Sequence, residues 1–318
     1  MSRPDFPKSL IEFNRQFQSE DDCFRFIIDS RWPDGFVCDR CANTKAWGRT
    51  DKHALQCTVC NKVYSATAGT VMHRSKQPLC LWLLAAYLVV TDKRGISAVQ
   101  LQKQLGIGRY ETAFNMLHKL RAAMVNPDRE SLRGTVEVDE TYIGGPVIGK
   151  HGRGTTKALV IGAVELQNDR PVRVRFNKIP SASAANVLKF VTDTVERGSE
   201  VITDGSPSYN GLYEKGYVQR VQSTRMLGDD PDKVLPNFHR AVSNMKTWLL
   251  GTHHGAVSQK HLQAYLNEFA FRYNRRRNLQ AAFQTILRSG PGKLDSGISG
   301  IAAWRWHYVV IRNRSEKR

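Results

Sequence analysis

The chain has 318 residues, and 47 Lys and Arg against 29 Asp and Glu give it a formal net charge of +18 at pH 7. This length allows about two domains with a substantial core, and 41% hydrophobic with 24% charged residues excludes a disordered or collagen-like chain. The longest apolar run, 79–90, falls well short of the roughly 20 residues that a membrane helix needs, so we expect a buried helix and no membrane partner. The positive charge favours a polyanion, with nucleic acid the first candidate.

The N-terminus and the cysteines indicate a compartment. Residues 1–13 contain Pro4, Pro7 and acidic side chains and lack the apolar segment of a secretory signal, so we expect a cytoplasmic chain, associated with the nucleoid when bound to DNA. Because the cytoplasm is reducing, the six cysteines are expected to be metal ligands or buried thiols rather than disulfide partners.

Residues 1–33 have apolar side chains at mixed helical spacing, which predicts two short helices. In the next segment, 34–73, the helical period is absent, and short strand-like pieces at Ala46–Arg49, 54–56 and Val63–Ser65 alternate with paired cysteines. These pairs, Cys38-x-x-Cys41 and Cys57-x-x-Cys60, have the spacing of a four-thiolate zinc site. The prediction is a zinc ribbon with one structural Zn²⁺ ion, because four thiolates leave the ion no open position for chemistry.

Other residues of the N-terminal segments allow two interpretations. Four unrelated buried thiols are the alternative to the zinc site, and Cys23 and Cys80, which have no partner at ligand spacing, are predicted to be small core residues. The basic side chains of the ribbon could contact DNA or form a solvated face: Arg49, Lys52, His53 and Lys62.

Residues 74–130 return to the helical period in three blocks, broken at 93–95 and 106–108. A helix from about Ala98, a glycine-containing turn and a second helix with an apolar inner face have the layout of a helix-turn-helix. The start of the second helix would present four residues to base edges of DNA: Arg109, Tyr110, Thr112 and Asn115. Three-helix packing without DNA is the alternative, and the basic charge together with the neighbouring ribbon favours DNA binding.

Beyond Pro127 the pattern becomes β-like at Thr135–Ile143, 158–166, 172–176 and 201–203, with helical stretches between and after these runs. This mixture predicts an α/β or α+β domain of the size of a catalytic domain at 131–286. The tail, 287–318, has no predicted structure, although Trp304, Trp306 and Tyr308 suggest that it docks on something.

Three acids of this domain are candidate metal ligands. Asp139 and Asp204 each end a strand-like run, where a sheet can offer carboxylates to a shared ion. Glu268 is a rare acid in a basic segment, and a helical wheel places it beside a buried stripe, on the side of Arg272 and Arg275. Carboxylates of this kind suit two Mg²⁺ or Mn²⁺ ions that assist in-line displacement at phosphorus. Nearby arginines would hold DNA phosphates: Arg272, Arg275, Arg276 and Arg277.

Each acid also has a structural alternative. Asp204 could simply form a turn with the glycine that follows it, and Glu137 or Glu140 competes with Asp139 for the same role. For Glu268 the alternative is an ion pair with Arg272, four residues later on the same helix.

Several motifs together resemble those of ISXO-like insertion-sequence transposases. They are the two cysteine pairs, Tyr64-Ser-Ala-Thr-Ala-Gly-Thr-Val-Met-His73, Gly95-Ile-Ser-Ala98, Met116-Leu-His-Lys119, Val136-Glu-Val-Asp-Glu-Thr-Tyr-Ile-Gly-Gly145, Thr203-Asp-Gly205, His239-Arg240, Trp248-Leu-Leu-Gly-Thr-His-His-Gly255 and Tyr265-Leu-Asn-Glu-Phe-Ala-Phe-Arg-Tyr-Asn-Arg-Arg276. The resemblance implies a ribonuclease-H-like mixed sheet with flanking helices, preceded by a zinc ribbon and a helix-turn-helix. It also implies a DDE-type triad of Asp139, Asp204 and Glu268. The wheel favours Glu268 over the adjacent Asn267, and His239 and Arg240 are expected to contact DNA.

The implied activity is that of a DNA transposase. Its partners would be double-stranded DNA, both the terminal inverted repeats of the element and the target DNA, and it would act as at least a dimer on that DNA. The enzyme would cut the element's ends with the help of divalent ions and join the freed 3′-OH to the target. Two alternatives remain: a non-catalytic DNA-binding regulator, and a nuclease of the same fold that does not transfer strands.

Overall fold

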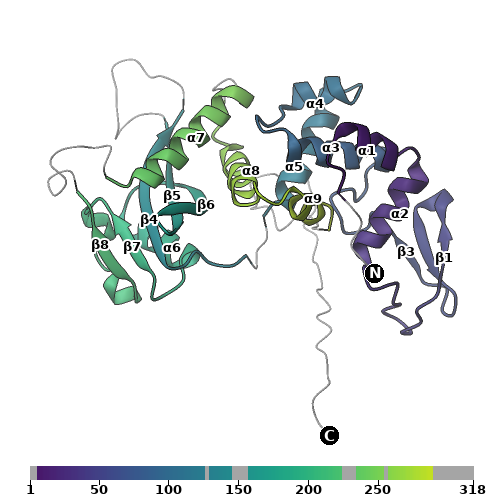
Figure 1. The fold of residues 1–318 in the computed structure, drawn as a ribbon, viewed down its shortest axis with the longest axis horizontal. Coiled ribbons are helices and arrows are strands. Elements are labelled where there is room, and N and C mark those ends of the chain that lie inside the picture. Colours follow the sequence, from purple (N-terminus) through teal and green to yellow (C-terminus); the bar gives the residue numbers. More distant parts are fainter. Residues whose placement is uncertain (1–5, 126–128, 145–156, 224–233, 254–256, 289–318) are drawn as a thin grey trace, which may run out of the picture.

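The structure is a computed structural model that describes residues 6–125, 129–144, 157–223, 234–253 and 257–288. A helical unit that carries the zinc ribbon and a unit built on a five-stranded sheet stand side by side, with α7 and α8 between them (Figure 1). Within the described residues, no helix combines the length and the apolar character needed to cross a membrane.

The helical unit begins with α1 (Leu10–Gln16) and α2 (Glu20–Arg31), and both start at a serine whose hydroxyl caps the helix. The long apolar run forms α3 (Leu79–Thr91), as predicted, and most of its side chains are buried. Glu20 at the start of α2 accepts hydrogen bonds from the backbone N–H groups of Leu79 and Cys80, so it caps α3 from a neighbouring helix.

A disulfide joins α2 to α3. It links Cys23 to Cys80, and the two residues are 57 positions apart in the sequence. Cys23 is fully buried in the core and Cys80 packs against it, as predicted, but the expectation that they are thiols is wrong. The packing of α2 against α3 brings together two positions whose proximity no local spacing reveals.

The ribbon consists of β1 (Ala46–Arg49), β2 (Ala54–Cys57) and β3 (Val63–Ser65), paired antiparallel in that order, with a 3-10 turn at Thr50–Lys52 between the first two strands. The predicted strand pieces are therefore present within one residue of their expected limits.

The predicted helix, turn and helix are also present, as α4 (Ala98–Gln104) and α5 (Tyr110–Ala123). Gly106 lies in the turn with a φ of +62°, a conformation that glycine adopts without strain. The inner face of α5 is apolar and buried, as expected: Ala113, Met116, Leu117 and Leu120.

The sheet unit has strands β4 (Thr135–Ile143), β5 (Ala158–Gln167), β6 (Arg170–Ile179), β7 (Glu200–Thr203) and β8 (Val218–Val221) in the order β6-β5-β4-β7-β8. Strands β6, β5 and β4 pair antiparallel, whereas β4, β7 and β8 pair parallel. Helix α6 (Ala184–Thr194) packs in the cluster on one face, and α7 (Pro236–His253) and α8 (Leu262–Asn274) pack in the cluster on the other. Two 3-10 turns, Pro207–Tyr209 and Tyr213–Lys215, lie between β7 and β8. This mixed sheet with flanking helices confirms the predicted fold class.

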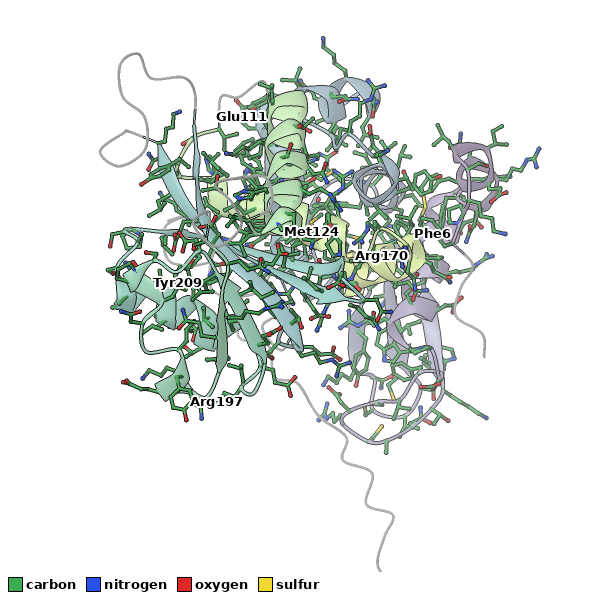
Figure 2. All side chains as sticks on the ribbon, turned by 60° about the vertical axis from the view of Figure 1, so that its left-hand side comes forward. Phe6, Glu111, Met124, Arg170, Arg197 and Tyr209 are labelled. Atoms are coloured by element: carbon green, nitrogen blue, oxygen red, sulfur yellow. A yellow bond between two sulfur atoms is a disulfide. The ribbon has the colours of Figure 1, made fainter. Side chains whose placement is uncertain are left out.

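The last described helix, α9 (Leu279–Arg288), returns to the helical unit and packs against α3. Its Phe283 and Ile286 are fully buried in the same cluster as the side chains of α2, α3 and α5. Figure 2 shows the side chains of both units, with Phe6 on the helical side and Tyr209 on the sheet side. The predicted limit at residue 286 therefore falls inside a helix of the helical unit, and Trp304, Trp306 and Tyr308 lie outside the described residues.

Candidate active site and metal centres

The parallel pairing of β4 with β7 brings two of the predicted acids together. Glu137 is aligned with Ile202, so continuing both strands by two residues sets Asp139 beside Asp204 on the same face of the sheet. Both carboxylates accept short local hydrogen bonds, Asp139 from the N–H of Glu140 at 2.7 Å and Asp204 from the N–H of Ser206 at 2.8 Å. The two aspartates form an acidic pair on neighbouring strands. Asp204 directly follows β7, as the sequence predicted, whereas Asp139 is the fifth of the nine residues of β4 and not at the end of that strand.

The electrostatics of this pair favour a bound cation. Burial raises the pKa of Asp139 to about 7, and the negative charges of Glu140 and Asp204 add to the rise, while the hydrogen bond from Glu140 lowers it. A divalent cation would offset both the burial and the mutual repulsion of the carboxylates. The pair is therefore a chemically suitable place for Mg²⁺ or Mn²⁺.

The acids that flank Asp139 serve other contacts. Glu137 is buried, and its carboxylate accepts hydrogen bonds from Asn237 Nδ2 at 3.0 Å and from the N–H of Phe238 at 2.6 Å. It therefore caps the N-terminus of α7, where negative charge is favourable. Glu140 accepts a hydrogen bond from the hydroxyl of Tyr209 at 2.9 Å. Of the three acids in this motif, only Asp139 is left to pair with Asp204.

The structure does not bring Glu268 to the two aspartates. Among the described residues, the only group of three or more His, Cys, Asp and Glu side chains close enough to share an ion is the cysteine set. Glu268 lies on α8 with 1% of its surface exposed, and its Oε2 accepts a hydrogen bond from Arg121 Nε of α5 at 2.7 Å. Arg272 Nη1 is 3.5 Å from Oε1, so the structural alternative, an ion pair four residues along the helix, is present. In this structure Glu268 forms a buried ion pair, and its predicted role as a metal ligand stays a prediction.

This ion pair lies in the interface between the helical unit and the sheet unit, which we call the joint. The guanidinium of Arg272 also donates to the carbonyl of Asp92 and lies over the ring of Trp248. In the same turn, Gly95 has a φ of +81° and lies so close to Trp248 that a Cβ would be 2.6 Å from its Nε1. The joint therefore consists of the turn after α3, the end of α5, and the facing parts of α7 and α8.

We expect Glu268→Ala to lower the free energy of unfolding by about 3–5 kcal/mol, because it leaves the buried Arg121 without its partner. Chemical denaturation measures this change. The matched control is Asp193→Asn, which breaks the exposed i,i+4 pair of Asp193 with Lys189 and should cost about 0.5 kcal/mol or less. A Glu268 variant with unchanged stability but no metal-dependent activity would return this residue to the metal site.

Sequence reasoning missed Arg121, although a signal was available. Its side chain is 3% exposed within the apolar face of α5, where an arginine requires a buried partner. The identity of that partner, 147 residues later, depends on the tertiary structure.

The predicted DNA-contacting residues at the start of α5 remain accessible. Arg109, Tyr110 and Asn115 are exposed, and Thr112 is half-buried. At the start of α7, His239 and Arg240 are exposed as well. These positions stay predictions as DNA contacts.

The predicted phosphate-binding arginines differ in their surroundings. The guanidinium of Arg272 is held inside the joint, so its predicted contact with DNA phosphate stays a prediction. Arg275 stacks on Phe271, and Arg276 stacks on Tyr273 while donating to the carbonyls of Pro171 and Val172. Arg276 is nevertheless exposed, as is Arg277, so these two keep surface available to a ligand.

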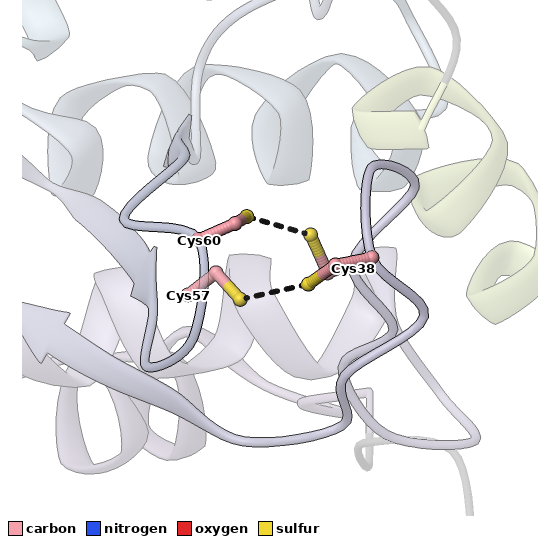
Figure 3. A group of neighbouring side chains, drawn as sticks. Cys38, Cys57 and Cys60 are labelled. Atoms are coloured by element: carbon pink, nitrogen blue, oxygen red, sulfur yellow. Dashed lines mark hydrogen bonds between the residues drawn. The ribbon is translucent and has the colours of Figure 1, made fainter.

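The four ribbon cysteines form a compact cluster, and Figure 3 shows three of them labelled. Their sulfur atoms all lie within 4.8 Å of one another, with Cys38 to Cys60 at 3.5 Å and Cys41 to Cys57 at 3.6 Å. A tetrahedral ion with Zn–S bonds of about 2.3 Å requires sulfur atoms about 3.8 Å apart, so the cluster fits zinc.

The two cysteine pairs have the same backbone geometry. In each, the residue after the second cysteine has a positive φ, Ala42 at 56° and Asn61 at 54°, and its N–H donates to the carbonyl of the first cysteine. Burial opposes ionisation of Cys57, but hydrogen bonds from the N–H groups of Cys60 and Val59 help lower its pKa to about 6.

A hydrogen bond from the N–H of Asn43 lowers the pKa of Cys41, but burial and the neighbouring cysteines raise it to about 12. Because the thiolate is the form that binds metal, Cys57 is prepared for zinc, whereas Cys41 would lose its proton when the ion binds.

The basic residues of the ribbon lie mainly in surface ion pairs. Lys62 pairs with Asp39 at 2.6 Å, Arg49 is 3.5 Å from Asp51, and His53 Nε2 is 3.9 Å from Glu20. This arrangement resembles the solvated face that was the alternative to DNA contacts.

Two family models match the chain. Residues 131–274 match the ISXO2-like transposase domain, and residues 18–63 match the transposase zinc-ribbon domain. Together the two matches span more than half of the sequence. No curated protein matches it.

Similar solved structures include a chain of the simian T-cell lymphotropic virus intasome in complex with PP2A regulatory subunit B56 gamma, with 15% identity and a TM-score of 0.30 over 54% of this chain and 67% of that chain. A pre-cleavage Mos1 transpososome has 11% identity and a TM-score of 0.27 over 66% of this chain and 79% of that chain. These TM-scores are too low to bear on function.

Proposed function

Because the chain belongs to the ISXO2-like transposase family, we propose that it binds the ends of a mobile DNA element, cleaves a phosphodiester there and joins the freed 3′-OH to target DNA. The observation that supports this proposal most directly is the pairing of Asp139 with Asp204 on adjacent parallel strands of the domain that matches the family. Within that domain, these two carboxylates share one face of the sheet, Asp139 from the middle of β4 and Asp204 from the position directly after β7.

Asp139 and Asp204 would hold divalent cations, Mg²⁺ or Mn²⁺, with further ligands from water and DNA phosphate. When bound, such ions stabilise the charge that develops on the attacking and leaving oxygens of an in-line displacement. The chain's own contribution is to fix the carboxylates: β4 and β7 set their spacing, and the local N–H groups orient them. Glu137 anchors α7 against β4 next to the pair.

The helical unit would provide the main DNA-binding surface. The start of α5 exposes Arg109 and Asn115, and the chain as a whole carries a net charge of +18. Positive charge of this size binds the phosphate backbone, and base contacts from a helix add sequence preference. Because two element ends must be joined in one event, we propose that at least a dimer acts on the DNA.

The test uses purified protein and duplex oligonucleotides from the DNA on either side of its gene. With Mg²⁺ we expect a nick at the element end followed by products in which that end is joined to a target plasmid, and with EDTA we expect neither. Binding without any nick would indicate a regulator. Hydrolysis without joined products would indicate a nuclease, and either result would overturn the proposal.

A further inference from the structure

A pocket lies at the seam between the helical unit and the sheet unit. Its volume is about 570 Å³, which is in the range of pockets that hold a small organic ligand. Its walls come from α4 and α5 and from the end of α7 and the start of α8. The residues that matter here are Lys103, Tyr110, Phe114, Arg121, His253 and Tyr265.

Aromatic rings form much of the wall. Tyr110 and Phe114 are neighbours on one side of α5, with ring centroids 5.8 Å apart. On the opposite wall, the ring of Tyr265 lies 4.2 Å from that of His253. Tyr265 is 8% exposed and has the guanidinium of Arg121 over its ring, so the rings available for stacking are those of Tyr110 and Phe114. These favour a flat, aromatic ligand over a branched aliphatic one.

The polar groups of the pocket favour a ligand rich in hydrogen-bond acceptors. Arg121 is almost fully buried, and although its Nε donates to Glu268, its Nη2 has no hydrogen-bond partner among the described residues. A buried guanidinium N–H without an acceptor is unfavourable, so a ligand that supplied one would stabilise the site. Lys103 is exposed at the pocket, and none of the described lining residues is acidic.

The position of the pocket connects it to DNA. Tyr110 is 43% exposed and stands at the start of α5, the end that is predicted to meet base edges. A base displaced from a duplex on that surface would be near the aromatic walls, with its phosphate near Lys103.

We propose that this pocket binds a single nucleobase extruded from the bound DNA. The base stacks on Phe114 and Tyr110, and its ring acceptors receive a hydrogen bond from Arg121 Nη2. Extrusion costs unstacking energy that such contacts can offset, most easily where the base is already unpaired. This inference rests on the proposed DNA-binding function.

The experiment compares two duplexes that differ at a single position. The first is fully paired, and the second carries one unpaired 2-aminopurine at that position. We expect wild-type protein to bind the second duplex about five- to a hundredfold more tightly. This range is the ratio of dissociation constants that corresponds to the free energy of stacking one base on an aromatic side chain. The fluorescence of 2-aminopurine should fall as the base stacks. Phe114→Leu, which keeps an apolar side chain but removes the ring, should bring the ratio of the two affinities close to one.

The matched control is Tyr213→Ala, which removes a ring that is 86% exposed and does not line the pocket, and it should keep the wild-type ratio. Because the ratio is measured within each protein, a general loss of DNA affinity does not imitate the effect. A wild-type ratio near one, or an unchanged ratio in Phe114→Leu, would overturn the pocket assignment while leaving the proposed function intact. Failure to bind either duplex would overturn the proposed function, and this inference with it.

Discussion

Replacing Asp139 by asparagine is expected to abolish cleavage and strand transfer, with a loss on the order of a thousandfold or more. The change removes one negative charge from the acidic pair and so weakens the binding of the divalent ion. Such an ion lowers the activation free energy of phosphoryl transfer by several kcal/mol. Asp204→Asn should have the same effect, because the two carboxylates lie on adjacent strands and would share the ion. The measurement is the rate of nicking and joining with Mg²⁺.

The control for this prediction is again Asp193→Asn, which changes an exposed aspartate on α6 and should retain full activity. DNA binding by Asp139→Asn, measured by gel shift, should remain, because the change removes negative charge near a phosphate. Wild-type rates in both Asp139→Asn and Asp204→Asn would show that the acidic pair has no part in the chemistry.

Stabilisation by Mg²⁺ should depend on pH. Because the pKa of Asp139 is raised to about 7, its carboxyl keeps a proton below that pH, and a cation must displace it. The apparent affinity for Mg²⁺ should then fall about tenfold for each pH unit below 7, and the rise in Tm caused by Mg²⁺ should be larger at pH 8 than at pH 6.

The metal-free protein should show the opposite trend. Between the ordinary pKa of 3.8 and about 7, the folded state holds a proton that the unfolded chain has lost, so stability falls as pH rises across that window. Both dependences should be absent in Asp139→Asn. An equal Mg²⁺ effect at the two pH values would contradict the assignment.

Removal of zinc should unfold the ribbon. Binding of a structural zinc ion contributes about 10–16 kcal/mol in small zinc-finger peptides, far more than three strands of three or four residues can supply by packing. We therefore expect about one zinc per chain in the purified protein and rapid proteolysis of residues 34–73 after chelation or in Cys57→Ser.

Cys80→Ser tests the specificity of this effect. Cys80 lies in the disulfide with Cys23 and outside the cysteine cluster, so its replacement should leave the zinc content unchanged. Equal loss of zinc in the two serine variants, or full zinc in Cys57→Ser, would show that the four-cysteine cluster is not the zinc site.

Features encoded in short stretches of sequence were the ones that could be predicted. The cysteine spacing specifies the zinc ribbon because both ligand pairs lie on local turns, and the strand-like run around Asp139 specifies that this residue lies on a strand, although β4 continues to Ile143. Asp204 lies near Asp139 because β7 is short and parallel to β4, so that the residue directly after β7 comes beside the middle of β4.

Contacts between distant segments could not be predicted in this way. A helical wheel correctly set Glu268 beside Arg272, but it cannot show that Arg121 approaches from another helix and takes up the remaining charge. The disulfide of Cys23 with Cys80 has the same origin, because only the packing of α2 on α3 makes the two sulfurs neighbours.

Helix α9 is the last of the described helices to be synthesised, yet its side chains complete the core of the N-terminal helical unit. Phe283 lies against Phe6 and Phe26, so both ends of the described chain share one core. A ribosome that has finished the ribbon and the first five helices has therefore not yet made the helix that closes their core. A polypeptide that ended before α9 would present these N-terminal segments with their apolar core uncovered on that side.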